Sequence, residues 1–411
     1  MQRASIKHAK CLFFQRYFLY CTYENIASMK ISLKSLTVQQ ITIIKGIAIS
    51  IIVLHNFIHL LTGIGENQMN FDPIRISNLL NMVTSNPTSA LNLILSFFGH
   101  FGVQLFVFAS GYGLVKKHQN NVNFSFKKFI IPKIIKIYSL LAVGLLFFFV
   151  IFANEMTAIK VAKTLISSLS LCNNFFSERI FLYGPWWYFS LAVQLYLLFP
   201  LIFRFINKNS NKNFYISLIT SGLLIYALFP ITEHFNIPIF GICIGHLPEF
   251  ILGIGFARYA ELIINSKIFL LALIIFVASN LSIYLFPLSF ISATIILLTL
   301  LYPIYNDTIC KNKNGQNIIS KIFFFLGTIS MFMFALNGHI RFVTIPFLLN
   351  ITTRPYVVNE NTSQLFITLS AFLHFGIIVI IAYFLSHIYK KAINPILNKI
   401  TTKLLGNNVD F

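Results

Sequence analysis

The amino-acid sequence predicts an all-α protein, a polytopic membrane-embedded bundle of about ten transmembrane helices with both termini in the cytoplasm. Three observations support this. Hydrophobic residues make up 57% of the 411 residues and charged residues only 10%, whereas soluble domains carry about 25% charged residues. Apolar runs of the length that crosses a bilayer, about 20 residues, recur along the chain. Lys and Arg are concentrated in alternate connections between these runs.

The composition excludes several classes of protein. Too few polar side chains are available to cover a water-facing surface, which excludes a soluble enzyme. Disordered chains are poor in aromatic residues, whereas Phe alone contributes 46 residues here. The net charge of +20 would indicate nucleic acid in a soluble protein. The five cysteines are scattered without a CxxC pair, which argues against a disulfide framework or a zinc knuckle.

Ten apolar runs are candidates for membrane-spanning helices. We expect them near residues 41–61, 96–115, 134–153, 186–206, 214–231, 239–257, 267–285, 288–305, 322–347 and 366–389. Only Phe286, Pro287 and Leu288 separate the seventh run from the eighth. These two could therefore form one broken or re-entrant element.

The distribution of Lys and Arg tests this division independently. Of the 31 basic residues, 24 lie at the two ends of the chain or in alternate connections, and five lie in the intervening connections. By the positive-inside rule, this distribution predicts that both termini are cytoplasmic. The positive charge is then explained by basic connections of a membrane protein rather than by binding of nucleic acid. We expect a basic N-terminal segment over 1–40, whose true start could be Met29, a membrane domain over 41–390, and a basic tail over 391–411.

The first run carries the densest set of polar side chains at membrane depth, where such groups usually face a cavity or the bundle interior. His55 and His59 are four residues apart and share one helix face, with Asn56 beside them. Lys45 precedes His55 by about 15 Å at 1.5 Å per residue. Interfacial polar residues are the alternative, but this density favours a buried site. A metal site is disfavoured, because no Glu separates the histidines and no third ligand is evident.

Two further groups follow in the second and third runs. His100 and Gln104 are again four residues apart, and small residues such as Ser110 also suit close packing of helices. Lys133 and Lys136 stand where the chain enters the third run. They are explained equally well as determinants of topology and as a site for the phosphates of a cofactor that arrives from the cytoplasm.

Candidate cavity residues continue through the later runs. Trp187 lies at the outer end of the fourth run, where an aromatic belt and a platform for a sugar are the two interpretations. His246 is close enough to pair with Glu249. The remaining candidates are Gln194, Tyr196, His339 and Arg341.

Five stretches stand in a characteristic order along the chain. They are Lys45–His55, Gly102–Tyr112, Trp187–Pro200, Leu247–Gly253 and Leu326–His339. Together they resemble the signatures of the acyltransferase-3 family, polytopic bacterial membrane acyltransferases that modify cell-surface carbohydrates. The resemblance extends over residues 37–390.

Several positions depart from the usual pattern of that family. Lys45 stands where Arg is common, and two lysines replace the Arg-x-x-Arg that enters the third helix. The family histidine usually falls on the position of Asn56, one residue after His55. Ala192 stands where a Glu is often found.

The resemblance implies an O-acetyltransferase that moves an acyl group from acetyl-CoA to a hydroxyl of a lipid-linked or exported glycan. His55 would be the general base, with His59 as the nearby substitute. Lys45, Lys133 and Lys136 would neutralise the CoA phosphates. Acetyl-CoA would be a co-substrate, with no tightly bound cofactor. The expected surroundings are the bilayer of the bacterial cytoplasmic membrane, a glycan acceptor and no nucleic acid.

Two other interpretations stay open. Buried polar residues in ten helices also suit an exporter or flippase of surface polysaccharide, which would consume no thioester. A regulatory membrane scaffold without catalysis is the third interpretation, and Ala192 and the shifted histidine favour it.

Overall fold

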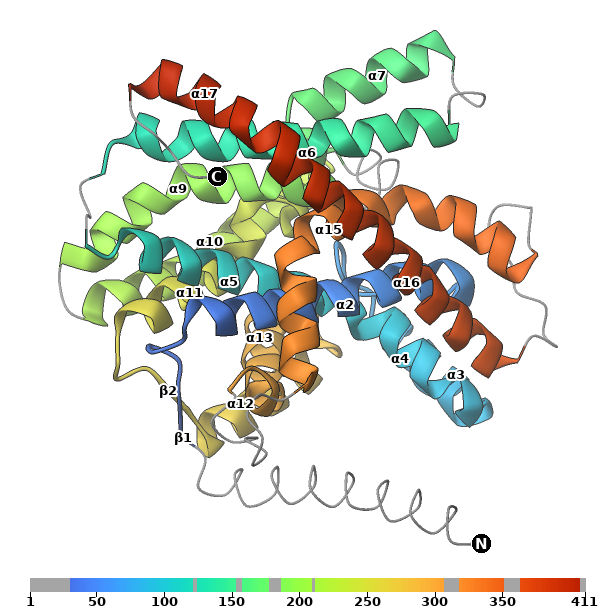
Figure 1. The fold of residues 1–411 in the computed structure, drawn as a ribbon. Coiled ribbons are helices and arrows are strands. Elements are labelled where there is room, and N and C mark those ends of the chain that lie inside the picture. Colours follow the sequence, from blue (N-terminus) through green and yellow to red (C-terminus); the bar gives the residue numbers. More distant parts are fainter. Residues whose placement is uncertain are drawn as a thin grey trace, which may run out of the picture.

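The computed structural model describes residues 30–120, 124–152, 157–176, 186–208, 211–306, 318–350 and 363–406, and these are almost entirely helical (Figure 1). Most of the expected N-terminal segment, residues 1–29 with Met29, lies outside them. The helices are α2 (Val38–Thr62), α3 (Pro73–Ser85), α4 (Ala90–Phe98), α5 (Gly102–His118), α6 (Phe126–Phe152), α7 (Ala158–Leu169), α9 (Trp187–Lys208), α10 (Asn211–His234), α11 (Leu247–Arg258), α12 (Ser266–Ser279), α13 (Leu288–Leu300), α14 (Tyr302–Tyr305), α15 (Ile318–Leu349), α16 (Gln364–Ile388) and α17 (Asn394–Leu405). Shorter turns include η2 (Gly99–Phe101), η4 (Asn173–Phe175), η6 (Ile239–Gly241), η7 (Cys243–His246) and the π-helical η8 (Tyr389–Ile393).

Two short strands tie the start of the described chain to its middle. Strands β1 (Lys30–Ser32) and β2 (Ile263–Asn265) pair antiparallel. Ile31 stands opposite Ile264, and both side chains are buried. The ribbon therefore fixes the chain just before α2 against the chain just before α12.

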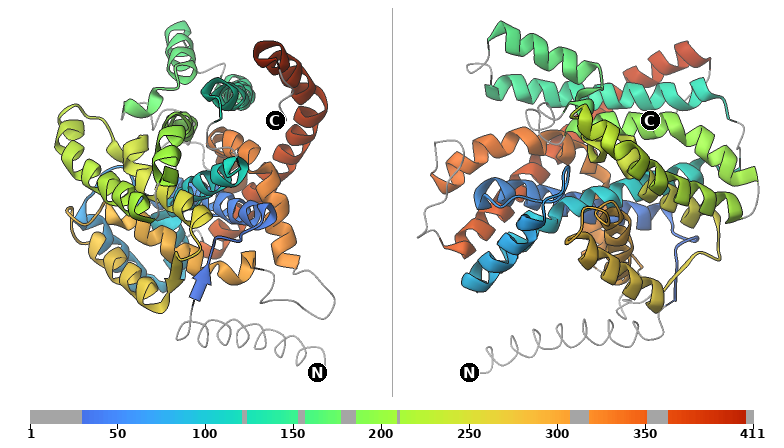
Figure 2. Two further views of the ribbon diagram at one scale, coloured as in Figure 1. Left: turned by 90° about the vertical axis from the view of Figure 1, so that its left-hand side faces the viewer. Right: turned by 180° about the vertical axis from the view of Figure 1, so that it is seen from behind.

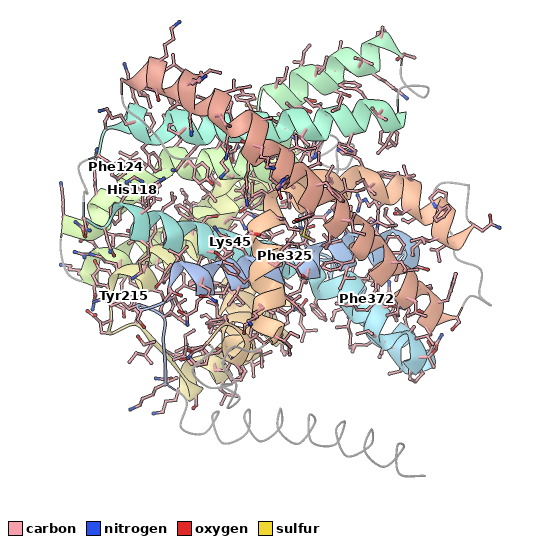
Figure 3. All side chains as sticks on the ribbon, in the orientation of Figure 1. Lys45, His118, Phe124, Tyr215, Phe325 and Phe372 are labelled. Carbon is pink, nitrogen blue, oxygen red and sulfur yellow. The ribbon has the colours of Figure 1, made fainter. Side chains whose placement is uncertain are left out.

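Seven helical stretches of the described chain are long and apolar enough to cross a bilayer. They are Val38–Thr62, Pro87–His118, Phe126–Phe152, Trp187–Lys208, Asn211–His234, Ile318–Leu349 and Gln364–Leu405. Each corresponds to one of the predicted runs. Large apolar side chains also cover outward faces, as on α16, where Leu369, Phe372 and Leu373 are each more than half exposed (Figure 3). A surface of this kind requires lipid, and the chain is a multi-pass membrane protein.

The other three predicted runs form shorter elements, so ten spans are not confirmed. The run at 239–257 becomes the turns η6 and η7 followed by the 12 residues of α11. Helices α12 and α13 have 14 and 13 residues, about 20 Å at 1.5 Å per residue, against a hydrocarbon core of about 30 Å. Pro287 stands just before α13 and interrupts the run. The two helices pack against each other, as a broken element would.

Helix α2 lies at the centre of the bundle and contacts α4, α5, α15 and α16 (Figure 1). Its start is fixed by a capping box, in which the Gln40 N–H donates to Thr37 Oγ1 and the Thr37 N–H donates to Gln40 Oε1, at 3.2 and 2.8 Å. Around it, α6, α7 and α17 lie at one edge of the molecule and α12 and α13 at the other (Figure 2).

The backbones of α2 and α15 touch where the two helices cross. A Cβ atom added at Gly46 would collide with the carbonyl oxygen of Phe323, and one added at Gly327 would collide with that of Thr42. Small residues allow this approach between membrane helices. The crossing therefore depends on two glycines, one from each helix.

We predict that Gly327→Ala lowers the thermal stability of the protein in detergent. The added methyl group meets backbone rather than a movable side chain, and overpacking of this kind costs about 1–3 kcal/mol. Gly222→Ala on α10 is the matched control, because nothing lies within 4 Å of its added Cβ. Equal melting temperatures for the two variants would contradict the close crossing.

Candidate active site

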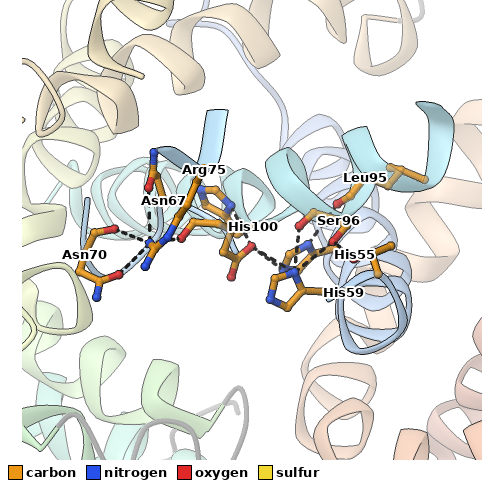
Figure 4. A network of polar contacts seen from close by, with 10 residues as sticks. His55, His59, Asn67, Asn70, Arg75, Leu95, Ser96 and His100 are labelled. Carbon is orange, nitrogen blue, oxygen red and sulfur yellow. Dashed lines mark hydrogen bonds and ion pairs between the residues drawn. The ribbon is translucent and has the colours of Figure 1, made fainter. Parts of the chain in front are cut away.

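Three histidines surround one carboxylate near the C-terminal end of α2 (Figure 4). Glu66 Oε2 lies 3.3 Å from His55 Nε2, 3.3 Å from His100 Nδ1 and 3.9 Å from His59 Nδ1. The rings of His55 and His59 stack with centroids 5.2 Å apart. The structure thus brings together three predicted residues and adds Glu66, which the sequence analysis did not single out.

Two glycines let the chain fold into this cluster. Gly63 has φ +62° and ends α2, a left-handed conformation that glycine adopts without strain, and the chain that follows it carries Glu66 over the helix end. Gly99 lies against His55, where a Cβ would come within 2.5 Å of His55 Cβ. Its missing side chain lets η2 approach α2, which places His100 beside the carboxylate.

Backbone carbonyl groups fix the orientation of two imidazole rings. His55 Nδ1 lies 3.1 Å from the carbonyl oxygen of Leu95, and His59 Nδ1 lies 3.2 Å from that of Ser96. A carbonyl oxygen only accepts, so His55 Nδ1 carries the proton and donates. His55 therefore turns Nε2 toward Glu66. His59 Nδ1 also lies 3.1 Å from the Ser96 hydroxyl, which can donate to the ring as well as accept from it.

The carboxylate carries a stable charge. Burial by itself opposes ionisation of Glu66, but the adjoining imidazoles, His55 foremost and then His100, outweigh it and lower the pKa of this carboxyl to about 2. Glu66 is therefore an anion throughout the neutral range and stabilises positive charge on an imidazole beside it.

Arg75 of α3 holds the loop that carries Glu66. One terminal nitrogen of its guanidinium donates to the carbonyl oxygen of Glu66 at 2.6 Å and to Asn70 Oδ1 at 2.8 Å. Asp72 caps α3 by accepting from the Ile74 N–H at 2.9 Å. These contacts fix the loop and thereby the position of the Glu66 carboxylate.

The cluster is open from the side of His59. The side chain of His59 is 30% exposed and that of Glu66 14%, whereas those of His55 and His100 are 5% and 1% exposed. A ligand from solvent thus meets His59 and Glu66 first and reaches His55 past them.

His55, His59 and Glu66 each offer one metal-ligand atom, all within 4.8 Å of one another. Glu66 supplies the third ligand that the sequence analysis did not find. The His59 nitrogen that lies nearest the carboxylate, however, already contacts both the carbonyl oxygen and the hydroxyl of Ser96, at 3.2 and 3.1 Å. A metal ion would require that ring to turn, so the observed arrangement suits proton transfer better than coordination.

The predicted lysines gather toward the other end of α2. Lys45 and Lys136 lie close enough to repel each other, as do Lys133 and Lys117, and Lys45 lies near the crossing with α15 (Figure 3). Lys133 also lies 5.5 Å above the ring of Tyr196. In the described part of the chain, the close acid–base pairs join histidines to Glu66 or Glu249, so these ammonium groups have no carboxylate within 4.0 Å.

A second group of predicted residues is buried between α5, α9 and α11. His246 Nδ1 lies 3.5 Å from Glu249 Oε1, as expected, and the Trp187 ring stacks on His246. Gln104 and Glu249 are fully buried. Both Trp187 and Trp186 are buried too, which argues against an aromatic belt at this position.

The remaining candidates bind other elements together. Gln194 donates to Asn174 Oδ1 at 3.0 Å and accepts from the Cys243 N–H at 3.0 Å, joining η4 to η7. Ser110 lies near the side chain of Tyr188. The hydrogen bonds of Gln194 thus connect neighbouring segments.

The polar residues of α15 lie against α2, α6 and α16. Arg341 donates to the carbonyl oxygen of Asn56 at 2.9 Å, so Asn56 is held through its backbone. His339 packs edge-on against Trp186 with centroids 4.4 Å apart. His374 of α16, which the sequence analysis missed, contacts Thr344 Oγ1 through Nδ1 at 2.8 Å.

A family model described as an acyltransferase domain, acyltransferase-3, matches residues 38–389. No curated protein and no solved structure matches the chain. The match covers nearly the whole chain, from the start of α2 to the end of α16. The protein belongs to the acyltransferase-3 family and is a membrane acyltransferase.

Proposed function

We propose that the protein is an O-acetyltransferase of the bacterial cytoplasmic membrane that transfers acetyl from acetyl-CoA to a hydroxyl of a lipid-linked or cell-surface glycan. The observation that carries this proposal is the pairing of His55 Nε2 with the Glu66 carboxylate at 3.3 Å, while His55 Nδ1 donates to Leu95. With the proton of the neutral ring on Nδ1, Nε2 is free to take a proton, and the imidazolium that results can donate from Nε2 to the Glu66 carboxylate.

His55 and Glu66 divide the work of proton transfer. The acceptor hydroxyl gives its proton to His55 Nε2 as its oxygen attacks the carbonyl carbon of the thioester. The imidazolium that forms is stabilised by the Glu66 anion. The carbon–sulfur bond then breaks, and the proton passes from His55 to the departing thiolate.

The lysines at the opposite end of α2 suit the donor. CoA carries several phosphate charges, and Lys45, Lys133 and Lys136 offer positive charge that no carboxylate neutralises among the described residues. With the phosphates at these lysines, the acyl arm has to reach about 15 Å along α2 to His55. The basic-residue pattern puts the lysines on the cytoplasmic side, where acetyl-CoA is made, and the imidazoles toward the outside.

We predict that His55→Ala abolishes glycan-dependent release of CoA from acetyl-CoA by protein in lipid. Loss of a general base costs on the order of 10²- to 10⁴-fold in rate. His387→Ala, at an exposed position of α16, should retain full activity. The assay supplies extracts of lipid-linked glycans from the host. Folded wild-type protein that releases no CoA with any extract would favour the exporter.

The pH dependence of the rate separates proton transfer from a purely structural role of Glu66. Because the pKa of Glu66 lies at about 2, the carboxylate stays charged above pH 5, and the acid limb of the profile reports protonation of an imidazole. Glu66→Gln keeps the shape of the side chain but removes the negative charge that favours protonation of the imidazole beside it. The acid limb should shift to lower pH by about one unit or more. An acid limb at the same pH in Glu66→Gln and wild type would show that Glu66 takes no part in the proton-transfer step.

We expect Lys133→Ala to raise the KM for acetyl-CoA about tenfold, because a hydrogen bond to a charged group contributes about 1.5–3 kcal/mol. The kcat should change little. Lys267→Ala is the matched control, because it removes an exposed positive charge on the same expected side of the membrane. Equal KM values for the two variants would place the CoA phosphates elsewhere.

A further inference from the structure

A pocket of about 340 Å³ opens beside the loop that carries Glu66. Its walls are Asn70 and Phe71 of that loop, Phe229 and Glu233 near the end of α10, Asn236, and Ile283 between α12 and α13. The volume lies within the range of small-molecule sites, about 300–1,000 Å³. None of the pocket residues belongs to the proposed catalytic group.

The lining combines flat apolar surface with hydrogen-bonding groups. Phe71 and Phe229 supply aromatic rings, and Phe71 is anchored by Phe286 at a centroid distance of 5.3 Å. Glu233 and Asn236 supply a carboxylate and an amide at the rim. Among the described residues that line the pocket, Glu233 is the one charged side chain, so a neutral ligand with several hydroxyls fits better than an anion.

The backbone at the rim is specialised. Asn236 has φ +52°, and its N–H donates to the carbonyl oxygen of Glu233 at 3.0 Å. Asn is one of the few residues that tolerate the left-handed conformation. This turn ends α10 and fixes Glu233 and Asn236 on the same rim.

Arg75 couples the pocket to the imidazole cluster. Its guanidinium nitrogen donates both to the Glu66 carbonyl oxygen and to Asn70 Oδ1. One side chain thereby holds the catalytic loop and the pocket wall in a single arrangement (Figure 4). A ligand seated in the pocket would therefore contact the same loop that carries Glu66.

We infer that this pocket binds a neutral sugar unit of the acceptor glycan, with a ring face on Phe71 and hydroxyls at Glu233 and Asn236. The inference rests on the proposed function for its choice of acceptor. The loop after α2 and the end of α10, which line the pocket, lie on the expected outer side, where an exported glycan arrives.

The test measures binding of free methyl glycosides to the full-length protein in lipid nanodiscs by saturation-transfer NMR. The probes are the neutral methyl glucoside, galactoside and N-acetylglucosaminide and the anionic methyl glucuronide. At least one neutral probe should bind to wild-type and His55→Ala protein alike, and the glucuronide should bind more weakly. Absence of binding by every neutral probe would overturn the inference.

Two variants locate the binding, each with a control. The first variant is Glu233→Gln, which changes an exposed side chain and leaves the core intact. The second is Phe71→Ala. Each should weaken binding of the glycoside about tenfold or more. The control for Glu233→Gln is Glu261→Gln, which changes an exposed carboxylate outside the pocket. The control for Phe71→Ala is Phe235→Ala, at a side chain beside α10 that is 66% exposed. Both controls should bind the glycoside as wild type does. Equal binding by all four variants would place the sugar elsewhere.

Activity separates this inference from the proposed function. Glu233→Gln should raise the KM for the glycoside that binds and leave kcat and the KM for acetyl-CoA unchanged. His55-dependent CoA release with no effect of Glu233→Gln would overturn only the pocket. Binding in the pocket without any CoA release would overturn only the acetyltransferase.

Discussion

The architecture depends on the direct contact between the backbones of α2 and α15. Gly46 and Gly327 leave no side chain between the helices where they cross. In a bilayer, where apolar side chains gain little by leaving lipid, such packing supplies much of the attraction between helices. The contact fixes α2, and α2 carries both the lysine at one end and the histidines at the other.

The position of Glu66 follows from a second constraint, the turn at the end of α2. A buried carboxylate is stable only when charge or hydrogen bonds compensate for the loss of water. The left-handed turn at Gly63 carries Glu66 over three imidazoles, and Arg75 binds its backbone from the other side. The anion therefore lies beside three imidazoles that it stabilises when they take up a proton, and the loop that carries it is held by Arg75.

The seven long helices could be predicted from the sequence because length, hydropathy and basic connections all indicate the same division. The short elements η6, η7, α11, α12 and α13 could not, because an apolar run reports burial without reporting whether the chain crosses the bilayer. Pro287 was the available signal, and it marks a real break.

The histidines could likewise be predicted, since a polar side chain in an apolar helix is conspicuous. Glu66 was missed because it lies in a connection, where a carboxylate is ordinary. The usable signal was its place three residues after Gly63, in a chain with only 11 acidic residues. The contacts of Glu66 with His100 depend on the approach of η2 to α2 at Gly99, which no local pattern reveals.

The geometry of α2 also suggests how two substrates from opposite sides of a membrane could meet. The proposed phosphate site and the proposed base lie on one rigid helix about 15 Å apart, so the donor has to extend along α2 and the acceptor has to enter from beyond Thr62. With His55 and His100 almost fully buried and His59 at the opening, an acceptor hydroxyl displaces little bulk water when it reaches the base. In this arrangement a thioester is exposed mainly to the hydroxyl that is seated beside it, which favours transfer to the acceptor over hydrolysis.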